Sequence, residues 1–401
     1  MRPTRFLRIL GLLLLSLPLL AAGAQGNSAP ALPDLNTAGD LGTDLFAQSG
    51  STGMVLVVVR GNQVFFRGYG ETAPGSSQVP TEDSLIRLCS LTKIFTADLL
   101  TRLAAEKTVK LDDPLQRYAP RKILVPTRDG KAITLEDLAT HTSGLPRELG
   151  TAGRATPHFT FPDYGTRWRW LPNQALRSTP GTAALYSNIA YDFLSDALAA
   201  ATHKQYAALL SERTLEPMHM WSTTYFPTPE QCDKLMKGAH DERACATTEA
   251  TAGSSGLYSS ARDMTTWLKY LLGTGTPAIP QQDPDAQQVY IKPADLVRQI
   301  GLDHAGEPTG VGLGWIHILP LDSESTIVQK TGGGAGFSTY IAINHARQTA
   351  IFVAATDGVE THVNLFNAAN KLLLAIAGLP PLPPPPPRPV RRHHRARRRK
   401  A

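Results

Sequence analysis

Segments typical of β-strands lie near both ends of this chain and enclose a middle that is mostly helical. Residues 54–60 are apolar and β-branched, Gly61-Asn62 forms a two-residue turn, and residues 63–69 alternate in polarity, so this stretch predicts a β-hairpin. Further strand-like segments occur late in the chain, over residues 311–319, 325–330, 337–344 and 348–356. We therefore expect one antiparallel sheet in which the first and last strands meet, with a helical lobe inserted between them.

Helical patterns fill the middle of the chain and return once near its end. The predicted helices span residues 90–103, 133–139, 189–201, 261–272 and 362–376. The first of them is apolar on most faces, which is typical of a buried helix. Together with the strands, these helices predict an α+β fold in the form of an α/β/α sandwich, in which helices flank the antiparallel sheet. With 401 residues, 42% of them hydrophobic, the chain is long enough to build such a core.

The first 24 residues have the pattern of a secretory signal peptide. Three arginines precede an apolar run over residues 9–20 that is short for a membrane span, and Ala22-Gly23-Ala24 supplies the small residues needed for cleavage before Gln25. An uncleaved membrane anchor is the alternative, and Pro18 disfavours it. We expect the protein to be exported, and residues 25–44 to form a flexible lead.

The last residues, 379–401, are rich in proline and then in arginine, and they predict a disordered basic tail. Residues 388–400 carry eight basic side chains, and three more lie in the first eight residues, which leaves 29 basic against 34 acidic residues elsewhere. The remaining chain is therefore mildly acidic and is no general polyanion binder, so we expect no nucleic-acid partner. The tail either has no partner or contacts an anionic membrane or wall surface.

A serine and a lysine, Ser90 and Lys93, open the predicted buried helix. Such a pair would occur about once by chance in a chain of this size, so the spacing alone is weak. Its position strengthens it, because side chains at i and i+3 share one face of the first helical turn. The N-terminus of the helix also offers N–H groups and a positive dipole end to a developing oxyanion.

Two more polar motifs follow at the ends of predicted elements. Tyr186 and Asn188 come after the Pro180-Gly181 turn and just before a helix, on a loop rim where catalytic groups tend to lie. Lys330-Thr331-Gly332 ends a predicted strand and begins a run of glycines. A phosphate-binding P-loop has the opposite order, with the lysine after the glycines and a helix following, so we exclude it.

In this order the three motifs predict an acyl-transfer site with Ser90 as the nucleophile. A serine hydroxyl needs a base, and Lys93 and Tyr186 are the candidates. Each can act only if its pKa, normally ~10, falls towards the working pH. Repulsion between the Lys93 and Lys330 ammonium groups favours their neutral forms and a tyrosinate. The sequence leaves both bases open.

The remaining motif residues are expected to hold the substrate. Asn188 would bind a substrate amide, and Lys330-Thr331-Gly332 would bind a carboxylate. The backbone N–H groups of Ser90 and Gly333 would form the oxyanion hole. Glycines at a strand edge would also let a substrate backbone approach the sheet closely.

The three cysteines show no metal-ligand spacing, and we predict neither a metal site nor a cofactor. Cys232 and Cys245 lie 13 residues apart in a polar stretch, where export would allow a disulfide that contributes about 3 kcal/mol. Two free thiols are the alternative. Cys89 begins an apolar segment and is expected to be a small buried hydrophobe, not a nucleophile.

The ordered motifs resemble those of the serine penicillin-recognising family, in the branch of the class C β-lactamases, which has Tyr-x-Asn where class A enzymes have Ser-Asp-Asn. The resemblance spans about residues 45–378, which we predict to be a single β-lactamase-like domain. Supporting signatures lie at residues 138–146, 254–264 and 314–315. Residues 83–93 and 329–337 and the cysteine pair at 232 and 245 are most similar to AmpH-type D-alanyl-D-alanine carboxypeptidase/endopeptidases.

This resemblance implies a periplasmic serine peptidase, either free or peripheral on the inner membrane. It would cleave D-Ala-containing stem peptides and cross-links of peptidoglycan through an acyl-enzyme on Ser90, and β-lactams would acylate it. His141 lies in a structural loop of such relatives and is not expected to be catalytic. A class C-type β-lactamase or small-ester hydrolase is the first alternative, and a non-enzymatic penicillin sensor or wall-binding module is the second. Aromatic side chains between residues 159 and 170 are expected in the core, with substrate contact as the alternative.

Overall fold

The computed structural model describes residues 32–150, 156–240, 244–274, 285–302, 305–321, 323–358 and 365–382. The predicted signal peptide and the basic residues 388–400 lie outside these ranges. The α-helices are α1 (Thr37–Ser49), α2 (Thr92–Ala105), α3 (Leu135–Ala139), α4 (Tyr164–Trp170), α5 (Asn188–Thr202), α6 (Tyr206–Leu210), α7 (Pro229–Asp233), α8 (Ala261–Leu272) and α9 (Leu365–Ile376). No helix in the described ranges is long and apolar enough to cross a membrane.

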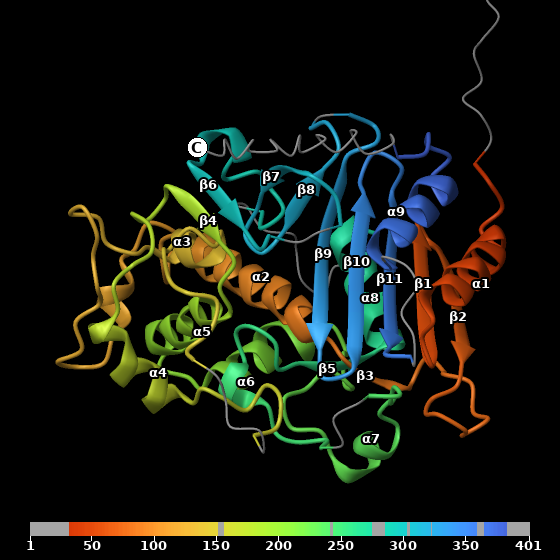
Figure 1. Cartoon of the computed structure of the whole chain (residues 1–401), viewed down its shortest axis with the longest axis horizontal. Helices are drawn as coiled ribbons and strands as arrows, with labels where there is room; N and C mark the ends of the chain where they lie inside the picture. Colours follow the sequence, from red (N-terminus) through yellow and green to blue (C-terminus); the bar gives the residue numbers. More distant parts are fainter. Residues whose placement is uncertain are drawn as a thin grey trace, which may run out of the picture. The chain divides into compact units, whose positions relative to one another are not determined.

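The strands are β1 (Gly53–Arg60), β2 (Gln63–Gly70), β3 (Leu85–Arg87), β4 (Ala183–Leu185), β5 (Tyr258–Ser260), β6 (Arg298–Ile300), β7 (Pro308–Val311), β8 (Ile316–Ile318), β9 (Ile327–Gly334), β10 (Phe337–Asn344) and β11 (Thr349–Thr356). The main sheet is antiparallel in the order β2-β1-β11-β10-β9-β8-β7 (Figure 1). Strand β1 pairs with β11, with Val57 opposite Phe352. The prediction that the first and last strands meet in one antiparallel sheet is therefore confirmed.

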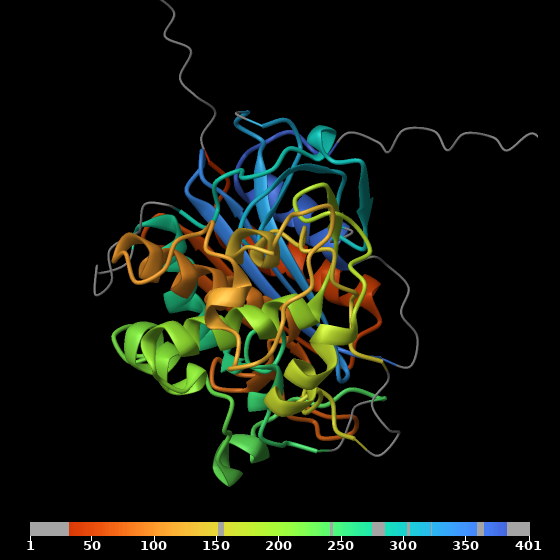
Figure 2. The same cartoon turned by 90° about the vertical axis from the view of Figure 1, so that its left-hand side faces the viewer.

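Both faces of the sheet are covered, because alternate residues of β1 belong to different apolar layers. Val55, Val57 and Val59 pack with the buried residues of α2, α5 and α8, whereas Leu56 and Val58 pack with those of α1 and α9. The helical lobe that follows α2 lies in front of the sheet in Figure 2. This arrangement confirms the α+β class and the helix–sheet–helix layering.

The predicted strand over residues 311–319 is two strands, β7 and β8, in the structure. The chain turns between them at Gly314, whose φ of 78° is accessible mainly to glycine. A Cβ at Gly314 would lie 2.9 Å from the Tyr191 hydroxyl and 3.3 Å from the Lys93 carbonyl oxygen, so the turn also packs closely against α2 and α5. Strand β9, in turn, runs through its glycines to Gly334 instead of ending before them.

The prediction of a flexible lead over residues 25–44 is wrong from Thr37 onward, where α1 begins. Ala38 and Leu45 are buried and pack with β1 and α9. Two glycines weaken the helical pattern of this segment, but Gly42 is needed, because a Cβ there would overlap the Tyr69 hydroxyl.

The predicted start of the disordered tail at residue 379 is also wrong. Leu379 is buried, and Leu382 packs against the same apolar layer as α9. The packed part of the chain therefore reaches at least Leu382, because both leucines bury apolar surface against this layer.

The structure joins Cys232 to Cys245 in a disulfide, with their Cα atoms 5.7 Å apart. Cys89 is a free thiol with no exposed surface. Burial raises the pKa of the Cys89 thiol to about 12, so the thiolate does not form near neutral pH. Both cysteine predictions agree with this arrangement.

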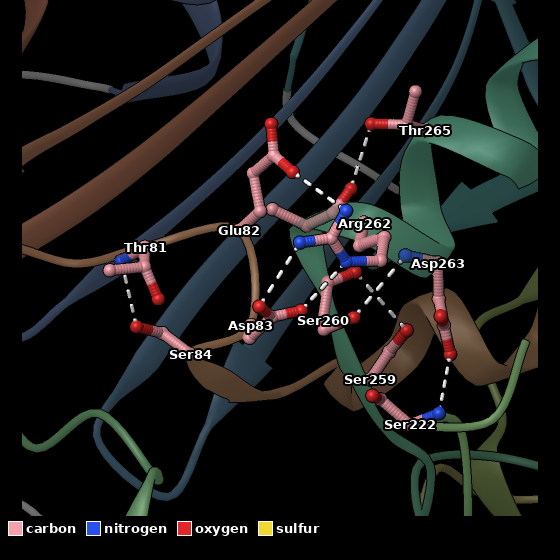
Figure 3. Close-up of polar contacts among 11 residues, drawn as sticks. Thr81, Glu82, Asp83, Ser84, Ser222, Ser259, Ser260, Arg262, Asp263 and Thr265 are labelled. Carbon is pink, nitrogen blue, oxygen red and sulfur yellow. Dashed lines mark hydrogen bonds and ion pairs between the residues drawn. The ribbon is translucent and has the colours of Figure 1, made fainter.

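A polar cluster fastens the start of α8 to the segment before β3, and so to the chain that leads to Ser90 (Figure 3). Ser260 caps α8 by accepting from the Asp263 backbone N–H at 3.2 Å. Arg262 binds Asp83 through Nε at 2.7 Å and Glu82 through a terminal nitrogen at 3.0 Å. Because β3 also pairs with β5, the approach to Ser90 is held on two sides.

Candidate active site

Ser90 lies in a tight turn between β3 and α2, in the 3-10 helix Cys89–Leu91. Cys89 has a φ of 52°, a backbone conformation that costs energy for a residue other than glycine. Strand β9 packs directly against this turn: a Cβ at Gly332 would lie 2.7 Å from the Leu88 carbonyl oxygen and 3.2 Å from the Ser90 nitrogen. The fold thus brings the first and third motifs together.

Lys93 points back along the first turn of α2 towards Ser90. Its Nζ donates to Ser90 Oγ at 3.2 Å, to Asn188 Oδ1 at 2.7 Å and to the Ser254 carbonyl oxygen at 2.7 Å. The side chain has no exposed surface. Burial lowers the pKa of Lys93, and the nearby Lys330 ammonium lowers it further, whereas Tyr186 acts in the opposite direction.

Tyr186 follows β4, and Ser187 then caps α5. The Tyr186 hydroxyl donates to Ser90 Oγ at 2.7 Å. Three cations surround its ring, with Lys93 Nζ at 5.1 Å, Lys330 Nζ at 5.0 Å and Arg147 Cζ at 4.7 Å from the centroid. This positive charge stabilises negative charge that develops on the phenol oxygen during a reaction.

Asn188, the first residue of α5, connects Lys93 to a loop outside the three motifs. Its Oδ1 accepts from Lys93, and its Nδ2 donates to Glu148 Oε1. The Asn188 backbone N–H donates to the Arg147 carbonyl oxygen at 2.9 Å. The amide is therefore fixed with its oxygen towards the buried amine and its nitrogen towards an exposed carboxylate.

Lys330, Thr331 and Gly332 lie on β9 and pair with β10 on one side, where Lys330 is opposite Ile341. On the other side, the pairing with β8 ends at Gln329. The next residues of β9 thus face the Ser90 turn instead of a strand. A Cβ at Gly333 would meet nothing closer than the Phe337 carbonyl oxygen at 3.8 Å, so the space above this edge is open.

His141 lies behind Tyr186, with their ring centroids 4.5 Å apart. Its Nδ1 accepts from the Ser187 backbone N–H at 3.2 Å. Burial holds the pKa of His141 well below its usual value, and the Lys330 and Lys93 ammonium groups act in the same direction. A neutral imidazole in this position orients Tyr186 and the start of α5.

Comparison with known proteins identifies the family. The family model described as Beta-lactamase matches residues 40–376. This chain belongs to the Beta-lactamase family. The resemblance inferred from the motifs is thereby confirmed.

Relatives in this family include enzymes with peptidase names. The chain is 41% identical over 339 residues to "D-alanyl-D-alanine-carboxypeptidase/endopeptidase AmpH" of Escherichia coli (strain K12), covering 84% of this chain and 88% of that protein. Among solved structures, the "Beta-lactamase/D-alanine Carboxypeptidase from Yersinia pestis complexed with citrate" is 39% identical, with a TM-score of 0.80, and the match covers 86% of this chain and 99% of that one. A class C beta lactamase from Rhodobacter sphaeroides, 22% identical over 85% of this chain and 99% of its own, shares the fold with a TM-score of 0.68.

The family fold also brings residues to the site that the sequence analysis did not single out. Arg147, Glu148 and Ser254 contact Tyr186, Asn188 and Lys93. Arg147 and Glu148 directly follow a recognised signature, and Ser254 begins another. Their position next to a motif was thus the one sequence feature that could have pointed to them. Residue type alone did not indicate which of their atoms would face the site.

The aromatic segment between residues 159 and 170 divides between core and site. Trp168 is buried in the lobe and donates to Asp196, as expected for a core residue. Phe159 instead lies beside β9, since a Cβ at Gly334 would be 3.1 Å from its ring. Of these aromatic side chains, Phe159 therefore lies near the end of β9, where substrate contact, the alternative to core packing, is feasible.

Proposed function

We propose that this chain is a periplasmic serine DD-carboxypeptidase/DD-endopeptidase that cleaves D-Ala-containing peptides of peptidoglycan. One observation carries the proposal: two groups capable of proton transfer, from separate segments, converge on one serine hydroxyl. Tyr186 OH lies 2.7 Å and Lys93 Nζ 3.2 Å from Ser90 Oγ. The name of the 41%-identical Escherichia coli relative supports the same substrate class.

The reaction begins when Ser90 Oγ attacks the carbonyl carbon of the scissile D-Ala peptide bond and gives its proton to Lys93 or Tyr186. The resulting oxyanion accepts hydrogen bonds from the backbone N–H groups of Ser90 and Gly333. The C–N bond then breaks, and the leaving amine takes up the proton that the base received. Water hydrolyses the acyl-enzyme through the same groups and restores the serine.

The motif residues on β9 and at the start of α5 hold the substrate. Lys330, Thr331 and Gly332 bind the carboxylate of the leaving D-amino acid, with the Lys330 ammonium supplying the opposite charge. Asn188 binds an amide of the acyl portion through its side chain. The backbone of β9 after Gln329, where the pairing with β8 ends, pairs with the extended peptide.

The first test is covalent labelling by benzylpenicillin, followed by intact-protein mass spectrometry. We expect the wild type to gain the mass of one penicillin and Ser90→Ala to gain none. Ser84→Ala removes another buried serine, just before β3, and serves as the matched control that still labels. An unlabelled wild type, or undiminished labelling of Ser90→Ala, contradicts the proposal. Product analysis of purified muropeptides then separates carboxypeptidase from endopeptidase cleavage.

A β-lactamase is the second candidate, because the 39%-identical Yersinia pestis structure carries both activities in its name. The two functions share acylation and differ in how fast water releases the acyl group. Turnover of nitrocefin, of p-nitrophenyl esters and of muropeptides by the same preparation would distinguish peptidase, β-lactamase and esterase. Labelling without turnover of any of these would indicate a penicillin sensor.

We also propose that the basic residues 388–400 attach the exported protein to an anionic surface of the cell envelope. This segment carries eight basic residues and no acidic one. Each Lys or Arg near an anionic membrane contributes about 1 kcal/mol. The tail would thus concentrate the enzyme at its substrate without taking part in the chemistry.

A further inference from the structure

Glu148 is an acidic residue at the edge of the site, and the reaction above gives it no role. Its side chain is exposed, and its Oε1 accepts a hydrogen bond from Asn188 Nδ2. Asn188 is the residue proposed to bind an amide of the acyl portion of the substrate. An acid in contact with Asn188 therefore adds a negative charge at the place where the acyl portion binds.

The backbone before Glu148 is tied to the start of α5 by hydrogen bonds. The Arg147 carbonyl oxygen accepts from the Asn188 N–H at 2.9 Å. The Ser187 hydroxyl donates to the Pro146 carbonyl oxygen at 2.7 Å. These contacts fix the two segments against each other, so the position of Glu148 beside Asn188 does not depend on the side-chain hydrogen bond alone.

The hydrogen bonds of the Asn188 amide decide how close the substrate comes to Glu148. Its Oδ1 accepts from Lys93 Nζ at 2.7 Å, so the oxygen is directed towards the buried amine. Its Nδ2 carries two hydrogens, of which Glu148 accepts one, and the other can be donated to a substrate amide oxygen. Two acceptors on one planar NH2 group, each about 2.9 Å from the nitrogen, lie about 5 Å apart. The bound amide oxygen and the Glu148 carboxylate would thus be close neighbours.

Arg147 and Lys93, two cations that border Asn188, are directed towards other groups. Arg147 Cζ lies 4.7 Å from the centroid of the Tyr186 ring. Lys93 Nζ binds the oxygen end of the Asn188 amide, opposite the end that contacts Glu148. At the nitrogen end of this amide, the contacting charge is therefore the negative charge of Glu148.

We propose that Glu148 is a specificity-determining residue that selects substrates with an ammonium group on the acyl portion. Where the residue before the D-Ala unit is a diamino acid, this group is its free side-chain amine. A cation a few bonds from the bound amide oxygen can reach the carboxylate, whereas an anion in the same place is repelled. The inference rests on the proposed acyl-transfer function of the Ser90 site and names the charge of the substrate that this site prefers.

The test compares three penicillins that differ in one group on the carbon next to the acyl amide. Benzylpenicillin has a hydrogen there, ampicillin an ammonium group and carbenicillin a carboxylate. Time-resolved intact-protein mass spectrometry at about pH 6, where an α-amine is charged, gives the acylation rate constant for each. Glu148→Gln keeps an acceptor for Asn188 and removes the charge. The ratio of the ampicillin to the benzylpenicillin rate constant should therefore fall about threefold to fivefold, the scale of one exposed ion pair. The ratio of carbenicillin to benzylpenicillin should rise by a similar factor.

Two comparisons separate the charge of Glu148 from a general effect on the site. Glu212→Gln removes another exposed acid, which pairs with Lys204, and should leave both ratios at their wild-type values. High salt should lower the wild-type ampicillin ratio towards that of Glu148→Gln, because salt screens exposed charges. Acylation of Glu148→Gln by benzylpenicillin shows that the site of the variant is intact. If that acylation is lost, the salt dependence of the wild-type ratio decides alone.

The same selectivity should appear with peptides. Acetyl-Lys-D-Ala-D-Ala with a free side-chain amine should be cleaved with a higher kcat/KM than the form acetylated on that amine, and Glu148→Gln should reduce the difference. Equal ratios in the wild type and Glu148→Gln, for the penicillins and for the peptides, would overturn the inference. A wild type that none of the penicillins acylates would instead refute the proposed function, on which this inference depends.

Discussion

Three hydrogen bonds that Lys93 donates explain how one buried amine can serve both as a charged and as a neutral group. An ammonium has three donors, and the structure supplies three acceptors, on Ser90, Asn188 and Ser254. The neutral amine needs only two acceptors, so its lone pair can face Ser90 Oγ and receive the proton. Burial without these partners would cost several kcal/mol for the charged form.

Gly332 offers a residue-scale test of how closely β9 must approach the nucleophile. In Gly332→Ala the new Cβ would overlap Thr339 Oγ1 and lie 2.7 Å from the Leu88 carbonyl oxygen, so β9 must move away from the Ser90 turn. We expect the penicillin acylation rate to fall about 100-fold, as when an oxyanion donor is lost. Stopped-flow acylation of the folded variant measures this.

The control for the Gly332 variant is Gly333→Ala, whose Cβ would meet nothing within 3.8 Å and should leave the unfolding free energy unchanged. Gly332→Ala should lose about 1–3 kcal/mol from overpacking. A Gly332→Ala protein that acylates at the wild-type rate would mean that the tight contact between β9 and the Ser90 turn is not needed for the chemistry.

At the scale of elements, the polar cluster at the start of α8 contains both a surface ion pair and a buried carboxylate, whose contributions to stability can be compared. Arg262 and its partners are about half exposed, so Arg262→Ala should cost under about 1 kcal/mol. Asp263 is buried and accepts from the Ser222 N–H and the Thr223 hydroxyl, each at 2.8 Å, so Asp263→Ala should cost about 2–3 kcal/mol. Urea unfolding measures both, and equal losses would show that the ion pair matters more than its exposure suggests.

The elements that sequence could predict are those whose signal is local. The hairpin of β1 and β2, and helices α2, α5 and α8, follow from periodicity within one segment. Helix α1 was missed because its glycines mask the pattern, although the same glycines permit its packing against Tyr69. Helix α4 was missed because it has only seven residues, inside a loop rich in Pro and Gly, and so few residues do not reveal a helical period.

Across the whole molecule, only those residues of the site that belong to recognisable motifs could be predicted from the sequence. Ser90, Lys93, Tyr186, Asn188 and Lys330 carry recognisable spacings, and the fold gathers them around one hydroxyl. The hydrogen bond from Lys93 to the Ser254 carbonyl oxygen joins segments 161 residues apart in the chain, and Glu148 lies 40 residues from its partner Asn188. Such contacts arise from tertiary packing, for which no local pattern exists.

The basic tail provides a test at the scale of the whole chain, because it should change where the enzyme is without changing what it does. A protein ending at Leu382 keeps the packed leucines of the C-terminal segment and loses all eight basic residues. We expect it to sediment far less with vesicles of phosphatidylglycerol and phosphatidylcholine, or with isolated sacculi, at low salt. Added salt should release the full-length protein, since screening weakens exposed charges.

The matched control keeps the full length and the prolines but replaces the eight basic residues with glutamine. If charge is the cause, this variant should sediment as little as the truncated protein, and both should react with benzylpenicillin at the wild-type rate. Sedimentation with vesicles but not with sacculi would assign the anionic surface to the membrane, and the reverse would assign it to the wall. Equal sedimentation of all three proteins would refute attachment through the tail, because the mildly acidic remainder of the chain would then account for binding by itself.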